Sequence, residues 1–277
     1  MKKHLTKIVR KNKLENKDLY KVVLSQNERN LNLPDSLFNN FISSIKQKDI
    51  FFYPNIKNLR SKLAKYLGVK GYNLLFTPRS DLGIKTLFEC FDLKGKNIIT
   101  SNYCFPMYNV YAELYECKIK KVRYTDKGLN FRWILDKIDE DTQFIILANP
   151  NSPLGDYYTF DQIKTLLDTG IHVIIDEAYI ELTDKKSLVK KIKTYTNLTI
   201  IRTFSKGYGA AGCRVGYIVS DKSNIDIFNK FRFMYELSGM SAKYCEFILD
   251  NIVYFNRYTE KTFLAKNELV ERLNKKG

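Results

Sequence analysis

The residue whose type and neighbours most clearly suggest reactivity is Lys206, which lies in the stretch RTFSKGYGAAGCRVGY. Ser205, Gly207 and Gly209 surround it, and such small neighbours allow a backbone or a ligand to approach closely. A lysine that ends a buried strand is partly desolvated, which frees its amine to form a Schiff base with an aldehyde. The alternative is an ordinary solvated lysine in a loop, and this stretch alone does not exclude it.

Other stretches carry side chains that could bind an anion or a cation. Arg214 could bind a phosphate through a bidentate contact, with Ser205 nearby. Ser80 and Asp81 open a predicted helix, whose free N–H groups form an anion site; a simple helix cap is the alternative. Asp176 ends the apolar run HVIID, where a carboxylate needs a bonding partner. That partner is either an arginine or a cationic ligand such as a pyridinium nitrogen.

The elements that must position these groups alternate between apolar strands and helices. Runs such as NIITSN, TQFIILANP, HVIIDEAY and LTIIRTFS predict buried strands, and helical spacing separates most of them. This order predicts a mostly parallel sheet with helices on both faces. Active sites of such sheets lie at the carboxyl ends of the strands. The clusters TPRSD, ANPNSPLG, IIDEAY and IIRTFSK all follow strand ends, so the pattern predicts one shared site.

Composition argues against several classes of site. The chain has 277 residues, 44% of them hydrophobic, which is enough for a large core. Its two histidines, His4 and His172, and five cysteines without a C-x-x-C pair argue against zinc, di-iron and Ser-His-Asp sites, so we expect no metal. We expect the cysteines to be free thiols in a reducing compartment. His172 lies next to a predicted strand, and we interpret it as structural rather than as a catalytic base.

The net charge of +16 would suit a nucleic acid or an anionic substrate. No nucleic-acid-reading motif accompanies the charge, and lysines are spread along the chain, so we expect no nucleic-acid partner. The sequence contains no apolar run long enough for a transmembrane helix, and the basic amino terminus lacks the apolar core of a secretory signal. We therefore predict a cytoplasmic protein without membrane association.

Taken together, these stretches resemble the fold-type I, pyridoxal-phosphate-dependent aminotransferases of class I/II, specifically the histidinol-phosphate aminotransferase-like group. DEAYIEL followed by RTFSKGYGAAGCRVGY is similar to the aspartate-to-lysine core of that group nearly residue for residue. ANPNSPLG resembles its N-P-N-N-P-T-G loop, YPNIKNLRSKLAKYLGV its tyrosine–proline segment and CFPMYNVYAE its P-T-Y-x-M-Y segment. The resemblance extends from SQNE near the amino terminus to about residue 250.

The resemblance implies pyridoxal 5'-phosphate as cofactor and three catalytic side chains. Lys206 would form a Schiff base with the cofactor and, once released by substrate, move a proton at the substrate's alpha carbon. Asp176 would keep the ring nitrogen protonated, so that the ring acts as an electron sink. Tyr179 would hydrogen-bond the phenolic oxygen of the ring.

The resemblance also implies further cofactor-binding residues. Phe105 falls where the family stacks an aromatic ring on the cofactor. Tyr53 matches a residue that reaches the cofactor of the neighbouring subunit, which implies a homodimer. The phosphate would be bound by the side chains of Ser205 and Arg214 and by the helix-opening N–H groups at Ser80 and Asp81.

The chain departs from the family pattern in three places. Ser152 replaces the asparagine that usually bonds the phenolic oxygen, and we expect the serine or neighbouring Asn151 to take over with weaker tuning. Arg79 replaces a usual glycine and either crowds the phosphate loop or adds a cation beside it. The chain ends at Gly277, short of the group's usual length, so we expect an incomplete C-terminal small domain without its substrate-binding arginine.

The expected fold is α/β: a three-layer αβα large domain with a mostly parallel sheet, of the aspartate aminotransferase kind, and a truncated small domain. We expect an N-terminal arm with part of the small domain at 1–44, the large cofactor-binding domain at 45–235 and the start of the small domain at 236–277. The expected activity is transamination between an amino acid, or a phosphorylated donor of the histidinol-phosphate kind, and a 2-oxo acid. A decarboxylase on the same scaffold and a truncated, non-catalytic cofactor-binding relative are the alternatives.

Overall fold

A seven-stranded sheet forms the centre of the protein. The computed structural model describes residues 4–5, 8 and 26–275, so the predicted N-terminal arm and the SQNE segment lie partly outside the described residues. The sheet order is β1-β9-β8-β7-β6-β2-β3. Its strands are β1 (Leu74–Pro78), β2 (Asn97–Ser101), β3 (Lys118–Val122), β6 (Thr142–Ala148), β7 (His172–Asp176), β8 (Leu198–Thr203) and β9 (Val215–Ser220).

The sheet is mostly parallel, as the sequence predicts. β9 pairs antiparallel with both β1 and β8, whereas the pairs β2–β3, β2–β6, β6–β7 and β7–β8 are parallel. The separate hairpin of β4 (Tyr124–Thr125) and β5 (Gly128–Leu129) was not expected from the sequence. The apolar runs that predicted buried strands form β2, β6, β7 and β8, which are buried along nearly their whole length.

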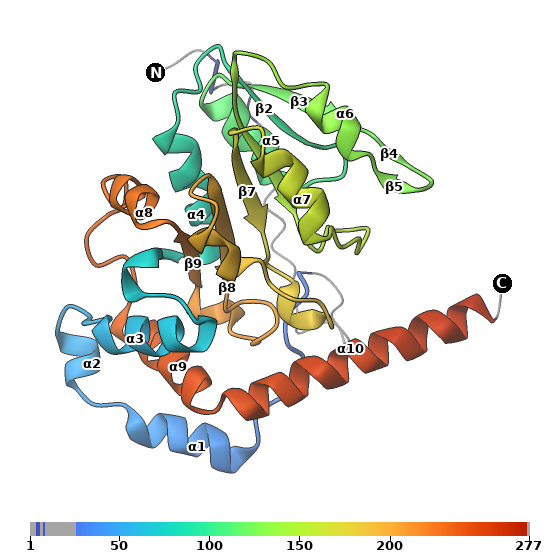
Figure 1. Ribbon diagram of the computed structural model, residues 1–277. Helices are drawn as coiled ribbons and strands as arrows, with labels where there is room; N and C mark the ends of the chain where they lie inside the picture. Colours follow the sequence, from blue (N-terminus) through green and yellow to red (C-terminus); the bar gives the residue numbers. More distant parts are fainter. Residues whose placement is uncertain (1–3, 6–7, 9–25, 276–277) are drawn as a thin grey trace.

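Helices cover both faces of this sheet (Figure 1). Their bounds are α1 (Asp35–Ser44), α2 (Lys48–Phe51), α3 (Lys57–Leu67), α4 (Arg79–Cys90), α5 (Met107–Leu114), α6 (Phe131–Leu135), α7 (Phe160–Leu167), α8 (Lys222–Phe228), α9 (Gly239–Asp250) and α10 (Ile252–Asn274). Alternate residues of β6 belong to two apolar cores: Phe144 and Ile146 pack with α4, α5 and α8, whereas Ile145 and Leu147 pack with α3, α6, α7 and α9. The expected three-layer αβα architecture is therefore confirmed.

Local sequence signals set several helix ends. α3 ends at Gly68, whose φ of 69° lies in the left-handed region that favours glycine. α7 begins with a capping box, in which the side chains of Thr159 and Gln162 each accept a hydrogen bond from the other residue's backbone N–H. The short helices α1, α2 and α6 were not expected from the sequence. In α1, Phe41 packs edge-on against Tyr244 of α9, with 4.8 Å between ring centroids, so the amino- and carboxyl-terminal helices meet.

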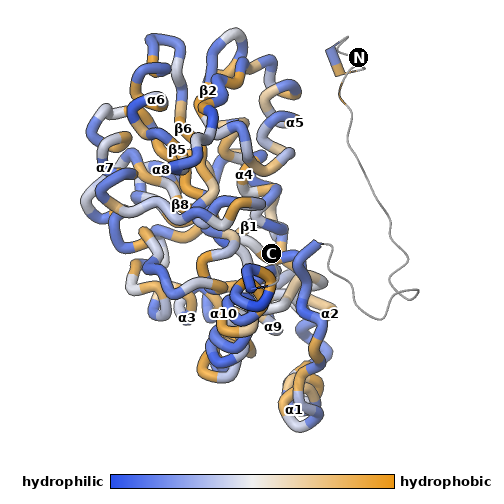
Figure 2. The backbone as a smooth tube through the Cα atoms, turned by 90° about the vertical axis from the view of Figure 1, so that its right-hand side faces the viewer, coloured by the Kyte–Doolittle hydropathy of each residue, from blue (hydrophilic) through white to orange (hydrophobic). Residues whose placement is uncertain are grey.

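The last helix, α10, extends away from the sheet along the lower side of Figure 1. Its first turns are anchored, since Phe255 and Thr259 are buried. Further along, apolar side chains including Leu264, Leu269 and Leu273 are exposed. Hydrophobic and hydrophilic stretches accordingly alternate along its tube in Figure 2. Within the described residues, none of the helices combines the length and the apolar character needed to cross a membrane.

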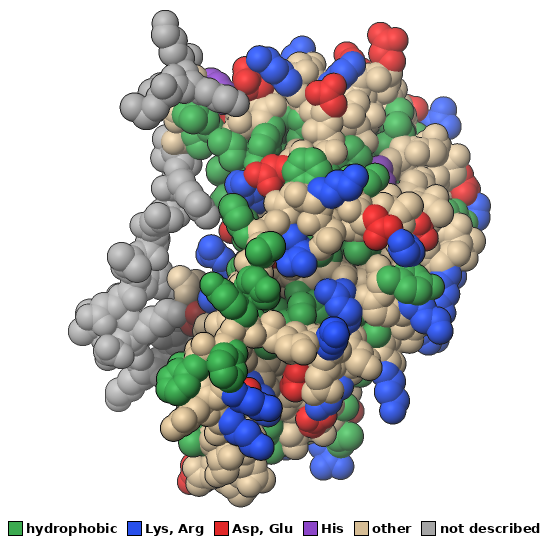
Figure 3. All heavy atoms as spheres, turned by 90° about the vertical axis from the view of Figure 1, so that its left-hand side faces the viewer, with side chains coloured by type: hydrophobic (Ala, Val, Ile, Leu, Met, Phe, Trp, Pro, Cys, Tyr) green, Lys and Arg blue, Asp and Glu red, His purple; other side chains and the backbone are tan. Residues whose placement is uncertain are grey.

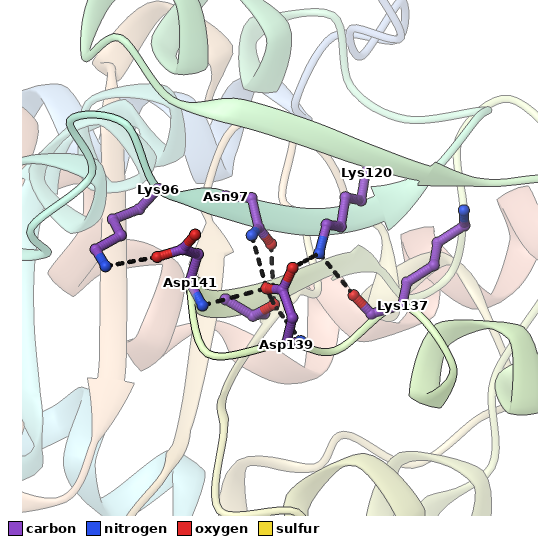
Figure 4. A network of polar contacts seen from close by, with 7 residues as sticks. Lys96, Asn97, Lys120, Lys137, Asp139 and Asp141 are labelled. Carbon is purple, nitrogen blue, oxygen red and sulfur yellow. Dashed lines mark hydrogen bonds and ion pairs between the residues drawn. The ribbon is translucent and has the colours of Figure 1, made fainter.

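A dense polar network joins the amino ends of β2 and β6 to β3 (Figure 4). Asp139 accepts hydrogen bonds from Asn97 Nδ2 at 2.8 Å and from Thr142 Oγ1 at 2.9 Å, and it forms an ion pair with Lys120. Beside it, Lys96 pairs with Asp141 at 2.6 Å. The hydrogen bond from Lys120, followed by those from Asn97 and Thr142, holds the pKa of Asp139 well below its usual range. The chain itself thus compensates this carboxylate.

Candidate active site

The opposite edge of the sheet encloses a cavity of about 440 Å³, within the ~300–1,000 Å³ typical of small-molecule sites. The carboxyl ends of the parallel strands meet here, and antiparallel β9 brings its amino end, preceded by Arg214, to the same edge. Most of the predicted site residues line the cavity: Ser80, Asp81, Phe105, Ser152, Asp176, Tyr179, Ser205, Lys206 and Arg214. The structure therefore brings together groups that follow β1, β2, β6, β7 and β8.

Two predicted site residues do not line this cavity. Asn151 is buried, donates from Nδ2 to the carbonyl oxygen of Tyr103 at 2.9 Å, and lines an adjoining pocket that also borders Lys206. Tyr53 is 78% exposed and stacks on Tyr235 with 4.4 Å between the ring centroids. Within this subunit, Tyr53 therefore contributes to a surface and not to the cavity.

Lys206 follows the end of β8 and is half-buried. Its Nζ donates to the carbonyl oxygen of Gln26 at 2.5 Å and lies 5.8 Å from the centroid of the Tyr179 ring. The sequence suggested that the glycines around Lys206 let a backbone or a ligand approach, and the structure shows side chains of the chain itself packed against them. A Cβ at Gly207 would overlap the side chain of Glu181, and one at Gly209 would lie 2.6 Å from Arg29 Cδ. Packing within the chain therefore requires these glycines.

Asp176 is buried at the end of β7, with 6% of its surface exposed. Its Oδ2 accepts from the Tyr108 hydroxyl at 3.1 Å and its Oδ1 from the backbone N–H of Ala178 at 3.0 Å. Burial raises its pKa to about 6. Among the described residues it forms no ion pair, although the charge of Lys206 in the same cavity opposes the rise in its pKa. Arg202, on the neighbouring strand, pairs with Glu181 at 2.6 Å. The site therefore leaves a buried carboxylate available for a cationic ligand.

The other end of the cavity contains Arg79 and Arg214, with the carboxylates of Glu28 and Asp81 also in its lining. Arg79 and Ser80 are the first residues of α4, where backbone N–H groups are free of helical partners. The backbone N–H of Arg79 donates to the carbonyl oxygen of Arg214 at 2.9 Å, so β1 and β9 hold the two arginines together. Burial, followed by the charge of Arg79, lowers the pKa of Arg214. A Cβ at Gly216 would overlap the backbone of Arg79 and Ser80, so glycine permits this close approach.

Sequence reasoning missed two contacts to the predicted catalytic residues. Tyr108, on α5, is fully buried and donates to Asp176; a tyrosine on the apolar face of a predicted helix was the available signal. Asn27 donates from Nδ2 to the Tyr179 hydroxyl at 3.0 Å. Asn27 and its neighbour Gln26 both have positive φ, at 50° and 67°. The segment that carries them therefore borders the cavity directly.

The described residues contain no group of three or more His, Cys, Asp or Glu side chains arranged for a metal. His172 begins β7, at the far edge of the sheet, and bonds Thr199 Oγ1 at 2.8 Å. Burial lowers its pKa to about 4, so it is neutral near pH 7, which supports the structural interpretation.

Comparisons with known proteins place the chain in a family and agree with this fold. The family described as aminotransferase class I and II matches residues 20–277. Histidinol-phosphate aminotransferase of Pyrococcus furiosus is 33% identical over 227 residues, which cover 80% of this chain and 65% of the relative. The corresponding protein of Buchnera aphidicola subsp. Schizaphis graminum is 36% identical over 203 residues, covering 69% and 56%. The chain thus spans less than two thirds of the length of these relatives.

Among solved structures, histidinol-phosphate aminotransferase from Sinorhizobium meliloti, in complex with pyridoxal-5'-phosphate, superposes with a TM-score of 0.77. The match covers 85% of this chain and 66% of that one, at 23% sequence identity. Identity this low establishes a shared fold only.

Proposed function

The chain belongs to the aminotransferase class I and II family, and we propose that it is a pyridoxal-phosphate-dependent aminotransferase of the histidinol-phosphate kind. It would transfer an amino group between an amino acid, or a phosphorylated donor resembling histidinol phosphate, and a 2-oxo acid. One observation carries this proposal: Lys206, Asp176 and Tyr179 line the same cavity as the positive start of α4. An amine, a buried carboxylate and an anion-binding end are the groups that this chemistry needs.

The residues present fit pyridoxal phosphate. The buried carboxylate of Asp176 accepts two hydrogen bonds and feels the charge of Lys206, but it forms no ion pair within the described part of the chain, which suits a protonated ring nitrogen. The free N–H groups at Ser80 and the guanidinium of Arg214 suit a phosphate. Among the described residues that line the cavity of about 440 Å³, Lys206 is the one lysine. The donor set therefore matches the aldehyde, ring nitrogen and phosphate of this cofactor.

The mechanism assigns one task to each catalytic side chain. The bound cofactor supplies an aldehyde and an electron-withdrawing ring. Asp176 holds positive charge at the ring nitrogen, and Tyr108 orients the carboxylate by donating to Oδ2. The Nζ of Lys206 removes and returns the proton at the alpha carbon of the substrate. Tyr179, whose hydroxyl accepts from Asn27, would hydrogen-bond the phenolic oxygen of the ring.

The remaining cavity residues bind and orient the cofactor. We propose that Phe105 stacks on the ring; it contacts Tyr108 edge-on, with 5.9 Å between centroids. Ser152 would bond the phenolic oxygen, with Asn151 supporting its loop. The phosphate would be bound by the backbone N–H groups of Ser80 and Asp81 at the start of α4 and by the side chains of Ser205 and Arg214.

We further propose a homodimer in which Tyr53 reaches the cofactor of the second subunit. A band of exposed apolar side chains supports this: Ile50, Phe51, Phe52, Tyr53, Phe233, Met234 and Tyr235. Exposed patches of this kind mark protein–protein contacts. Apolar side chains also lie open among lysines and arginines on the face drawn in Figure 3. The patch includes α2, which packs against α9 and so connects it to the rest of the subunit.

We propose the domain limits that the sequence predicts, although α9 of the small domain also packs on α3 and the core of the sheet. The whole sheet, from β1 to β9, lies inside the proposed large domain at 45–235. The proposed small domain combines 1–44 with 236–277, and contacts between α1 and α9 support this grouping. We also propose a cytoplasmic location without nucleic-acid or membrane partners, which the free state of all five cysteines supports.

The proposed function is tested by mixing the cofactor-loaded protein with single amino acids and with histidinol phosphate. Transamination predicts a shift of the visible absorption toward the amine form of the cofactor and the release of one carbonyl product per site. Subsequent addition of 2-oxoglutarate should restore the starting spectrum. Release of carbon dioxide would instead identify a decarboxylase. Bound cofactor that no donor converts would favour a non-catalytic relative.

A further inference from the structure

Arg79 has an unusual backbone conformation at the positive end of the cavity. Its φ of 74° lies in the left-handed region, which residues with a side chain rarely adopt. Hydrogen bonds on both sides fix this conformation: its N–H donates to Arg214, and its carbonyl oxygen accepts from Thr77 Oγ1 at 2.9 Å. Backbone strain of this kind concentrates at functional sites, so the side chain of Arg79 is a candidate for a functional role.

Arg79 and Arg214 both line the cavity. The charge of Arg79 contributes, after burial, to the lowered pKa of Arg214, whereas the carboxylates of Asp81 and Glu28 oppose this shift. Nη1 of Arg214 donates to the carbonyl oxygen of Ala211 at 2.6 Å, and the ion pairs of the described residues include neither arginine. The nearest carboxylate of the helix, Asp81, accepts from the Tyr111 hydroxyl at 2.6 Å. Two neighbouring cations at a helix start would be stabilised by a multiply charged anion.

We propose that Arg79 is a second phosphate-binding arginine, which with Arg214 clamps a phosphate monoester dianion at the start of α4. This inference rests on the proposed function and adds to it a selectivity for pyridoxal phosphate over unphosphorylated pyridoxal. One guanidinium and the free N–H groups would bind a phosphate, and the second cation matches its second negative charge. The chain would therefore discriminate strongly between pyridoxal phosphate and unphosphorylated pyridoxal. The strained backbone at Arg79 aims the side chain toward that end of the cavity.

The test compares the affinities of the protein for pyridoxal phosphate and for pyridoxal, measured by absorbance titration and equilibrium dialysis. Arg79→Gln and Arg79→Gly should weaken binding of pyridoxal phosphate roughly ten- to a hundred-fold, the range for a lost hydrogen bond to a charged group. Their affinity for pyridoxal should stay the same. Arg79→Lys, which keeps the charge but loses the bidentate geometry, should fall in between.

Two controls separate charge and folding from phosphate binding. Arg123→Gln removes one exposed positive charge near β3 and should change neither affinity. Arg79→Gly tolerates the positive φ, so its melting temperature without cofactor should equal or exceed that of the parent protein. The proposal is overturned if the Arg79 variants keep the parent preference for pyridoxal phosphate over pyridoxal. It fails together with the proposed function if the parent protein binds neither compound.

Discussion

The aspartates at the two edges of the sheet, Asp139 and Asp176, have opposite electrostatic surroundings. At the amino edge, Asp139 is met by Lys120 and by hydrogen bonds from Asn97 and Thr142, so the chain satisfies its charge completely (Figure 4). At the carboxyl edge, Asp176 is buried with two hydrogen bonds and no ion pair among the described residues. A carboxylate that the chain compensates stabilises the fold, whereas one left without a cation is available to a ligand.

The pKa values of the two groups reflect this difference. Hydrogen bonds and the ion pair lower the pKa of Asp139, and burial raises that of Asp176 to about 6. By linkage, ionised Asp139 stabilises the fold above its ordinary pKa, and this contribution is lost as the pH falls into the acid range. The contribution of Asp176 to the stability of the fold depends on pH in the opposite direction. It is highest below the ordinary pKa of the carboxyl group and is lost as the pH rises through about 6.

The largest expected difference between the edges concerns their lysines. Lys206→Ala should abolish covalent cofactor binding and reduce transamination by more than about a thousand-fold, because it removes both the amine and the proton carrier. The matched variant at the amino edge, Lys96→Ala, breaks only a partly exposed ion pair with Asp141 and should leave both properties unchanged. Initial rates and absorption spectra of both purified variants check this. Equal losses would mean that the carboxyl edge has no special role.

A second comparison uses the buried aspartate. Without cofactor, Asp176→Asn should be more stable than the parent protein by about 3 kcal/mol at pH 8, since a rise of roughly two pKa units is worth about that much. The difference should shrink as the pH falls through about 6 and disappear near pH 4. Urea unfolding at three pH values measures it. A parent protein as stable as the variant at pH 8 would refute the uncompensated state of this carboxylate.

The opposite result is expected for the amino edge. Asp139→Asn should lower the melting temperature at pH 7 by a few degrees, because Lys120 loses its partner. The gap should close as the pH falls into the acid range, where Asp139 is protonated in the parent protein as well. Cofactor affinity should not change. A weaker affinity for pyridoxal phosphate would show that the two edges are not independent.

The smallest effect is expected within the carboxyl edge itself. Ser152→Asn restores the residue usual in the family and should change cofactor affinity by no more than about tenfold, the worth of one neutral hydrogen bond. Equilibrium dialysis of the variant beside the parent protein measures this. A much larger gain would mean that Ser152 does not bond the cofactor in the parent protein.

The sequence predicted the strands and their polar ends well, because the buried runs of β6, β7 and β8 are apolar throughout. It did not predict α1 and α2, whose exposed apolar residues gave no clear helical face. It also missed the bond from Tyr108 to Asp176, because such a contact depends on how α5 packs on the sheet. The glycines beside Lys206 were predicted to let a backbone or a ligand approach closely, and the close approach that the structure shows is that of the Glu181 and Arg29 side chains.

The most direct test of the central claim is to find which lysine carries the cofactor. The protein is incubated with pyridoxal phosphate, reduced with borohydride and digested, and the labelled peptides are mapped by mass spectrometry. A single label on Lys206, absent from Lys206→Ala, is the predicted result. Labels scattered over exposed lysines of the +16 surface, with none enriched at Lys206, would contradict a cofactor site at the carboxyl edge of the sheet.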